Sequence, residues 1–190
     1  MGKGRLIRER YEATAKGYDE LYRAEQYEKY AATLRRVPPH GTVLDAGCGT
    51  GLLAEYMRAT GLLDRIDTLI CLDYSRAMLE IARWRLQIVC PGKCVTIEAN
   101  VENIPLADKS VDVTYSFTVL DLVDDLLGAV EELRRVTRGP VIASLLKKLP
   151  YKDKLIMLGA EIVAVTSKDV VLRLDSEGYS KTSTVPRTLT

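Results

Sequence analysis

The chain has 190 residues, of which 47% are hydrophobic and 28% are charged, and its formal net charge is +1. This length and composition suit one domain with a single substantial core. No apolar run reaches the roughly 18 residues that a membrane-spanning helix needs, and no secretory signal opens the chain, so we expect a cytoplasmic protein with no membrane partner.

Helices and strands alternate in the predicted order of elements, as in an α/β sheet. In chain order, we expect a helix at 3–36, a strand at 42–46, a helix at 50–60, a strand at 67–73, a helix at 75–88, strands at 94–99 and 111–116, a helix at 122–136, a strand at 139–145, a short helix at 151–158, and final strands at 160–166 and 169–174. Residues 1–174 should form one domain, with 1–36 as a helical cap. The Ser- and Thr-rich segment 175–190 shows no periodicity, so we expect a flexible tail there.

The most informative segment joins the first strand to the helix after it. The strand ends in Asp45, and three alternating glycines follow at Gly47, Gly49 and Gly51. Glycine lets the backbone approach a ligand closely, because it has no Cβ and accepts a positive φ. The start of the next helix offers unpaired N–H groups to a carboxylate or a phosphate. This order of strand, glycine turn and helix predicts a small-molecule site.

The second strand ends in an acid at the distance that a nucleoside-type cofactor requires. Asp73 lies about 20 residues after Gly51, where a carboxylate can accept hydrogen bonds from both ribose hydroxyls. The glycine segment also fits the dinucleotide fingerprint weakly, so a nicotinamide dinucleotide is an alternative cofactor. Asp45 argues against that alternative, because an acid at this point would repel a pyrophosphate and suits an ammonium or sulfonium group instead.

The four cysteines do not indicate a secreted disulfide framework. Cys48 and Cys71 fall in the glycine turn and the second strand, where we expect buried, reduced thiols. The Pro-Gly turn between Cys90 and Cys94 is able to bring two thiols together. We favour free thiols there over a local disulfide, and both over half of a metal site, because no second ligand pair is present. A disulfide in a cytoplasmic protein would suggest a hyperthermophilic source.

These segments together resemble the class I S-adenosylmethionine (SAM) dependent methyltransferases, and among them the subset related to ubiquinone and menaquinone biosynthesis. The resemblance rests on the glycine turn, on 72–79 with Asp73, and on 100–106, 110–116 and 132–136, and it covers about residues 10–174. It implies a three-layer, Rossmann-like, doubly wound sheet of seven strands, mostly parallel with an antiparallel last strand. The hairpin expected at 160–174 matches that last strand.

The resemblance also implies which residues bind SAM, namely Asp45, Gly47, Gly49, Gly51, Asp73, Tyr74, Met78, Asn100, Val101 and Ser116. The first acid and the glycines would hold the methionine part, and Asp73 would hold the ribose. Tyr74, Met78, Asn100 and Val101 would surround the adenine. Ser116 and Phe117 would line the wall near the reactive methyl. Relatives usually carry Asp in place of Asn100, whose amide oxygen can still accept a hydrogen bond.

Candidates for a catalytic group are few. His40, the sole histidine, precedes the first strand, so we expect a surface turn there and no histidine-based mechanism. Asp121 is the best-placed carboxylate, although it equally suits the cap of the helix expected to start near residue 122. Tyr11 and Tyr18 are the other candidates, because they could close over the cofactor and contact the sulfonium by a cation–π interaction. Packing of the N-terminal helix would explain both tyrosines equally well.

The acceptor is predicted mainly from what the chain lacks. No Asn/Asp-Pro-Pro-Tyr/Phe motif follows the fourth strand, which argues against transfer to adenine or glutamine amide nitrogens. The segment 147–150 is too short for a lid, so we expect an open site that suits a macromolecule or a completing partner subunit. Basic residues gather at two places, at Arg134, Arg135 and Arg138 and at Lys147, Lys148, Lys152 and Lys154. The lysines should lie near the ligand edge, where they could contact phosphates.

We therefore expect a SAM-dependent methyltransferase whose acceptor is RNA or a translation-related protein. A small quinone-like metabolite is a close alternative acceptor. A SAM-binding scaffold that activates a partner methyltransferase is the non-enzymatic alternative.

Overall fold

The computed structural model of the protein describes residues 3–174. Its centre is a seven-stranded sheet in the order β3-β2-β1-β4-β5-β7-β6. The strands are β1 (Gly41–Ala46), β2 (Ile66–Asp73), β3 (Cys94–Glu98), β4 (Val113–Phe117), β5 (Val141–Leu146), β6 (Glu161–Val165) and β7 (Asp169–Leu174). The first five strands are parallel, and β7 runs antiparallel to both β5 and β6. The expected seven-stranded, mostly parallel sheet is confirmed, and the expected tail at 175–190 lies outside the described residues.

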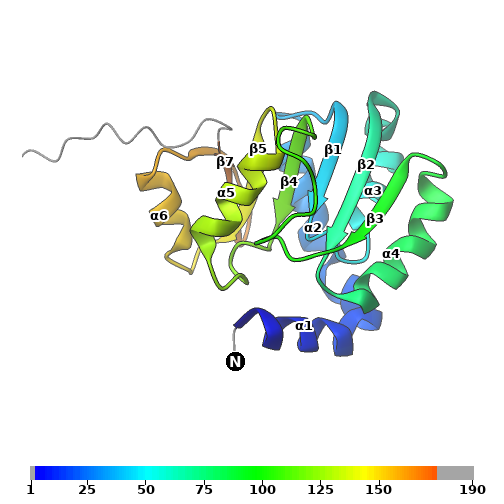
Figure 1. The fold of residues 1–190 in the computed structure, drawn as a ribbon, viewed down its shortest axis with the longest axis horizontal. Coiled ribbons are helices and arrows are strands. Elements are labelled where there is room, and N and C mark those ends of the chain that lie inside the picture. The colour runs from blue at the N-terminus through cyan, green and yellow to red at the C-terminus, as the bar shows by residue number, and fades with distance from the viewer. Residues whose placement is uncertain (1–2, 175–190) are drawn as a thin grey trace, which may run out of the picture.

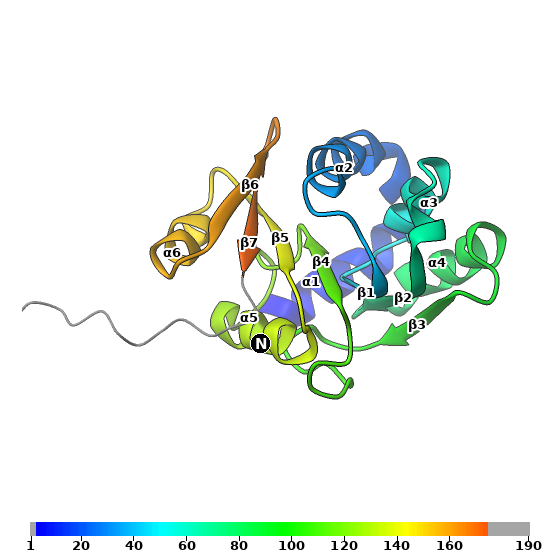
Figure 2. The ribbon, with the colours of Figure 1, turned by 90° about the horizontal axis from the view of Figure 1, so that it is seen from above.

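Helices cover both faces of the sheet and make three layers (Figure 2). The helices are α1 (Lys3–Thr14), α2 (Tyr18–Leu34), α3 (Leu52–Ala59), α4 (Arg76–Val89), α5 (Leu126–Val136) and α6 (Tyr151–Met157). Val43 of β1 belongs to the core cluster formed with α2, α3 and α4, whereas the next residue, Leu44, belongs to the cluster formed with α5 and α6. Because successive strand residues face opposite layers, a strand covered on both faces is apolar along its length.

The N-terminal segment is two helices and not the single helix expected at 3–36. A 3₁₀ turn at Ala15–Gly17 separates α1 from α2. Gly17 has no side chain to favour the helix and lies at the N-cap of α2. The break lets the two helices point in different directions. α2 packs on the sheet, and α1 crosses the carboxyl edge of the strands, below the sheet in Figure 1.

The segment after β4 also differs from its prediction. The helix expected at 122–136 begins at Leu126, so residues 118–125 form a loop at the carboxyl edge of the sheet. Asp125 is the N-cap, and its carboxylate accepts hydrogen bonds from the backbone of Leu127 and Gly128, both at 3.1 Å. The capping role considered for Asp121 is therefore wrong. A capping acid must directly precede the first turn, and Asp125 holds that position.

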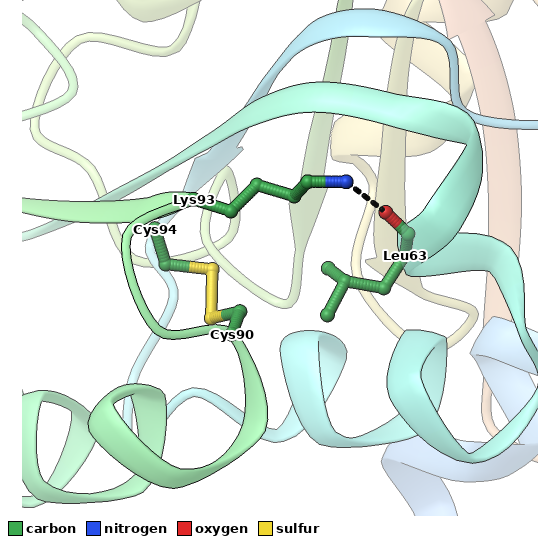
Figure 3. Close-up of a disulfide and its surroundings, with 4 residues drawn as sticks. All are labelled: Leu63, Cys90, Lys93 and Cys94. Carbon is green, nitrogen blue, oxygen red and sulfur yellow. Dashed lines mark hydrogen bonds between the residues drawn. A yellow bond between two sulfur atoms is a disulfide. The ribbon is translucent and has the colours of Figure 1, made fainter.

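Cys90 and Cys94 form a disulfide, so the expectation of free thiols there is wrong (Figure 3). The chain turns back at Gly92, and Lys93 N donates to Cys90 O at 3.1 Å, which brings the two Cα atoms to 5.7 Å. That separation lies within the range of natural disulfides. The Lys93 ammonium donates to Leu63 O at 3.2 Å and fixes the turn against the neighbouring loop. Cys48 and Cys71 are buried and free, as expected.

No helix within residues 3–174 is both long enough and apolar enough to cross a membrane.

Candidate functional site

A cavity that is open to solvent lies at the carboxyl ends of β1, β2 and β4. Strand order reverses between β1 and β4, and such a switch point is where open α/β sheets bind ligands. The cavity is lined by Arg8, Tyr11, Tyr18, Gly47, Gly49, Leu72, Asp73, Tyr74, Ser75, Met78, Ala99, Asn100, Val101, Glu102, Phe117, Thr118, Val119, Leu122 and Val123. The structure thus brings together most of the residues that the sequence predicted for the site.

The glycine turn forms the floor of this cavity. Gly47 N and Cys48 N both donate to Leu72 O, at 2.7 and 2.9 Å, so the turn is fixed to the end of β2. Gly47 has a φ of +83°, and a Cβ at this position would lie 2.1 Å from a methyl carbon of Val119. Glycine is therefore required for the loop after β4 to approach the turn. Gly51 does not line the cavity, and it is the left-handed N-cap of α3.

Asp73 connects the glycine turn to the start of α4. Its Oδ2 accepts from Gly49 N at 2.8 Å, and its Oδ1 accepts from Ser75 N at 2.8 Å. Burial raises the pKa of this carboxyl, and the backbone donors oppose that rise. Each carboxylate oxygen can accept a further hydrogen bond. Asp73 can therefore accept from ribose hydroxyls while it stays fixed by the backbone.

Asp45 lies behind the turn and not on the cavity surface. It is only 3% exposed, and its Oδ2 has no hydrogen-bond partner among the described residues. Burial, together with the nearby charge of Asp73, raises the pKa of Asp45 to about 8. A buried oxygen without a partner favours a ligand that brings positive charge, because such a ligand would compensate the lost hydration. The amino acid part of SAM, with its ammonium and sulfonium groups, fits this requirement, and a dinucleotide pyrophosphate does not.

The residues expected near an adenine line the part of the cavity beside the start of α4. Met78 is buried, whereas Tyr74 is half-exposed and lies below the Arg8 guanidinium, which is 4.7 Å from the ring centroid. Asn100 is held in a local turn, because its Oδ1 accepts from Glu102 N at 3.0 Å and its Nδ2 donates to Glu102 Oε2 at 3.1 Å. Val101 lines the same end.

Ser116 and Asp121 are the predicted site residues that fall away from the cavity. Ser116 is fully buried within β4, and its neighbour Phe117 lines the cavity instead. The Oδ2 atom of Asp121 accepts from Leu146 N at 2.7 Å, which joins the loop after β4 to the end of β5. The sequence analysis did not assign to the site the lining residues of that loop, namely Thr118, Val119, Leu122 and Val123, because it expected a shorter loop that ends in a helix at residue 122.

Tyr11 and Tyr18 both line the cavity, and their ring centroids are 6.1 Å apart. Burial raises the pKa of both phenols, so each keeps its proton over the physiological range. Tyr18 OH accepts a hydrogen bond from Gln26 Nε2 at 3.2 Å. The two tyrosines therefore offer hydroxyl donors and aromatic faces but no general base.

Two residues of α1 that the sequence analysis did not single out close the adenine end. Arg8 pairs with Glu98 at 3.1 Å. Glu12 accepts from the backbone of Arg76 and Ala77, at 2.8 and 3.1 Å. These N–H groups belong to the first turn of α4, where intrahelical partners are missing. An acid placed on a neighbouring helix satisfies them, and no local spacing rule would have found it.

A second contact fixes the start of α2 beside Tyr18. Thr50 of the glycine turn donates its hydroxyl to Asp19 Oδ1 at 2.5 Å, and the buried Arg85 of α4 pairs with the same carboxylate. Arg85 Nε also pairs with Glu55 of α3 at 2.9 Å. This network joins α2, α3 and α4, so Tyr18 is held over the cavity by residues from three helices.

Comparison with known proteins agrees with this geometry. A family model described as a methyltransferase domain matches residues 44–142. The malonyl-[acyl-carrier protein] O-methyltransferase of Pectobacterium atrosepticum is 40% identical over 113 residues, which are 58% of this chain and 41% of that protein. The chain therefore spans less than half the length of this curated relative.

Two solved structures show the same fold. The magnesium protoporphyrin IX methyltransferase of Synechocystis PCC 6803, solved with bound SAM, has a TM-score of 0.70 and 15% identity, with 91% of this chain and 96% of that chain covered. A methyltransferase solved with the Trm112 activator of Haloferax volcanii has a TM-score of 0.60 and 23% identity, with 71% and 59% covered.

Proposed function

This chain belongs to the methyltransferase domain family, and we propose that within that family it methylates a small acceptor whose oxygen is already anionic at neutral pH, such as a carboxylate. The proposal includes the activity and the cofactor, namely transfer of the methyl group of SAM, which the family match and the curated methyltransferases support. It also includes the class of acceptor.

The cofactor end of the cavity suits SAM residue by residue. The backbone of Gly47 and Gly49 would hold the methionine part, with Asp45 behind it as the compensating acid. Asp73 would hold the ribose, and the adenine would lie among Tyr74, Met78 and Val101. SAM supplies an electrophilic methyl group on a sulfonium. The chain has to hold that methyl in line with the acceptor oxygen and to exclude competing water.

The observation that carries the proposal is the chemistry of the other end. Phe117, Thr118, Val119, Leu122 and Val123 form a wall that is apolar except for one hydroxyl. The described residues of this wall include no histidine or carboxylate, Asp121 accepts from Leu146 N, and His40 is exposed in the loop before β1. An acceptor that must lose a proton would need a base. A carboxylate does not need one, because its oxygen forms the C–O bond while the C–S bond breaks toward sulfur and no proton leaves.

The curated relative supports the same class of acceptor. That relative is a malonyl-[acyl-carrier protein] O-methyltransferase, and a malonyl group carries a free carboxylate. The two chains share the segment around the cofactor site. The part of the relative that this chain does not match amounts to more than half of its length, since only 41% is covered.

An RNA or a translation-related protein is the second candidate acceptor, and the lysines after β5 favour it. Lys147 donates to Ser167 O at 3.3 Å, and Lys152 pairs with Asp153 at 2.9 Å, so part of this charge is used within the chain. At the opposite edge, Arg135 pairs with Asp108 and Arg138 with Asp112, both at 2.7 Å. The segment from Lys147 to Pro150 is a short turn without a lid, which leaves room for a macromolecule or an activating subunit.

Transfer of a radiolabelled methyl group from SAM tests these candidates directly. The wild-type protein is incubated with malonyl and succinyl thioesters, with their methyl esters as blocked controls, and with RNA and ribosomal protein fractions. We expect label on the free carboxylates, none on the esters, and no signal with Asp73→Ala. Label that appears only in RNA or protein, and falls steeply as salt is added, would instead establish the second candidate.

A further inference from the structure

We propose that the hydroxyls of Tyr18 and Thr118 form a two-donor anchor for the anionic oxygen of the acceptor, with Gln26 orienting both hydroxyls and the buried ammonium of Lys29 polarising that of Thr118. This inference rests on the proposed function and deepens it, because it assigns the residues that would select a carboxylate.

Gln26 sets the direction of both hydroxyls. It projects from α2 and is only 4% exposed. Its Nε2 donates to Tyr18 OH at 3.2 Å and to Thr118 Oγ1 at 3.4 Å, which uses both protons of the amide. Each hydroxyl therefore accepts on the side that faces Gln26. No described residue accepts the proton of either hydroxyl, and Gln26 Oε1 itself has no partner. Both residues line the cavity, and the proposal is that both protons are donated to a ligand there.

Lys29 supplies a positive charge directly behind Thr118. It is completely buried, and its ammonium has three partners, namely Glu25 at 3.1 Å, Asp169 at 3.3 Å and Thr118 Oγ1 at 2.5 Å. A buried charge is expensive unless every donor is satisfied. Glu25 and Asp169 would balance the charge of the ammonium, but Lys29 donates its third proton to the hydroxyl of Thr118 at the cavity wall. A hydroxyl that accepts from an ammonium becomes a stronger donor, because hydrogen bonds in a chain polarise one another.

The backbone at Thr118 holds its side chain in this position. Its φ is +61°, a left-handed conformation that a β-branched residue rarely adopts. Thr118 N donates to Ser144 Oγ at 2.9 Å, and the side chain is held by Lys29 and Gln26. Conformations of this kind persist only where the surroundings enforce them, and they concentrate at binding sites. The contacts that enforce this one come from α2 and β5.

In a purely structural role, the same cluster would only hold α2 against β7. The two roles differ in what the loss of a hydroxyl changes. A structural role predicts a lower free energy of unfolding and no change in the preference for anionic ligands. An anchor predicts weaker binding of anions specifically, with the fold and the cofactor site intact.

The test is calorimetric titration of the protein saturated with S-adenosylhomocysteine, using hexanoate as the anionic probe and hexanamide as its neutral analogue. We expect the wild type to bind hexanoate more tightly than hexanamide. Thr118→Val and Gln26→Leu should each weaken hexanoate binding about tenfold or more and leave hexanamide unchanged, because hydrogen bonds to charged groups are the strong ones. Thr118→Ser should retain the preference, and Thr96→Val, which removes a hydroxyl on β3, is the matched control.

Lys29→Met should also lose the preference, and circular dichroism shows whether that variant folds. The Thr118 variants keep the test decisive if it does not. Hexanoate binding that is equal in Thr118→Val and wild type, or reduced equally in Thr118→Val and Thr96→Val, overturns the anchor. The proposed function has a separate readout in the labelled-methyl assay. If carboxylates are methylated but Thr118→Val binds hexanoate as wild type does, only the anchor is wrong. If hexanoate binding depends on Thr118 but no carboxylate is methylated, only the proposed acceptor class is wrong.

Discussion

The two ends of the cavity are built in different ways. At the glycine turn of the cofactor end, backbone groups dominate, such as Gly49 N, which donates to Asp73 across 24 positions. At the acceptor end, side chains dominate, and the contacts of Thr118 with Lys29 and Gln26 span 89 and 92 positions. A site made of backbone leaves a spacing motif in the sequence, whereas a site made of distant side chains does not.

The ends also differ in charge. The cofactor end holds the buried Asp45 and the partly buried Asp73, and burial raises the pKa of both carboxyls. The acceptor end offers neutral hydroxyls, an apolar wall and a buried ammonium. The acids of the cofactor end suit a cationic ligand, and the donors of the acceptor end suit an anionic one. Attack of an anionic oxygen on a sulfonium methyl would bring these two ligands together.

The largest expected effect comes from a substitution where the glycine turn contacts the loop after β4. Gly47→Ala places a Cβ against Val119, whereas Gly61→Ala meets nothing within 4 Å although its φ is also positive. We expect Gly47→Ala to lower the free energy of unfolding by about 3 kcal/mol, from overlap plus a strained φ, and Gly61→Ala by about 1 kcal/mol. Urea denaturation measures both. Equal losses would mean that the close approach of the loop after β4 is unimportant.

Loss of Asp73 should damage the cofactor end alone. We expect Asp73→Ala to weaken binding of S-adenosylhomocysteine about 100-fold, since hydrogen bonds to a charged group are lost. Calorimetry measures this, with Asp67→Ala on the exposed part of β2 as the control. If the affinity of Asp73→Ala for S-adenosylhomocysteine equals that of wild type, the assignment of Asp73 to the ribose is wrong.

Replacement of Asp45 should change how stability depends on pH. The carboxyl is protonated in the folded protein up to about pH 8, but in the unfolded chain it ionises near pH 4. Between these values the folded state binds more protons, so wild-type stability falls as pH rises. Asp45→Asn has no such group. The free energy of unfolding of Asp45→Asn, relative to that of wild type, should therefore increase by about 1 kcal/mol for each unit that the pH rises across this window.

Unfolding in urea at several pH values, without cofactor, tests the prediction for Asp45. A difference between wild type and Asp45→Asn that does not change with pH would show that Asp45 is ionised in the folded protein. Asp112→Asn is the useful contrast, because hydrogen bonds from Thr42 N and Arg138, opposed by burial, hold the pKa of Asp112 below its usual value. That variant should lose stability relative to wild type above about pH 4.

The smallest expected effect is an absence of change at the acceptor end. With no histidine or carboxylate among the described residues of the acceptor wall, and with Tyr11 and Tyr18 protonated, turnover of a carboxylate acceptor at saturating SAM should be nearly flat between about pH 6 and about pH 9. Steady-state rates measure this, and Tyr18→Phe should lower the rate without adding a pH dependence. A rate that rises tenfold per pH unit would reveal a base, and would argue for an acceptor that has to lose a proton.

Sequence reasoning brought the glycine turn and Asp73 to one cavity, as the structure does, for a physical reason. Positive φ values at Gly47, Gly49 and Gly51 demand glycine, and the parallel register of β1 and β2 places the acid at the end of one strand beside the turn of the other. It failed where tertiary contacts compete. Gly17 ends a helix that periodicity alone would continue, and residues 122–125 belong to a loop where the start of a helix was expected.

The sequence by itself determined the family and the alternation of strands and helices, and it predicted a SAM site, because these follow from local patterns of strand, glycine turn and acid. Only the tertiary structure decided the rest. It showed that Asp121 serves β5, that Cys90 and Cys94 are joined, and that Lys29 lies behind Thr118. Each of these depends on side chains whose positions follow from packing of the whole domain and not from their neighbours in the chain.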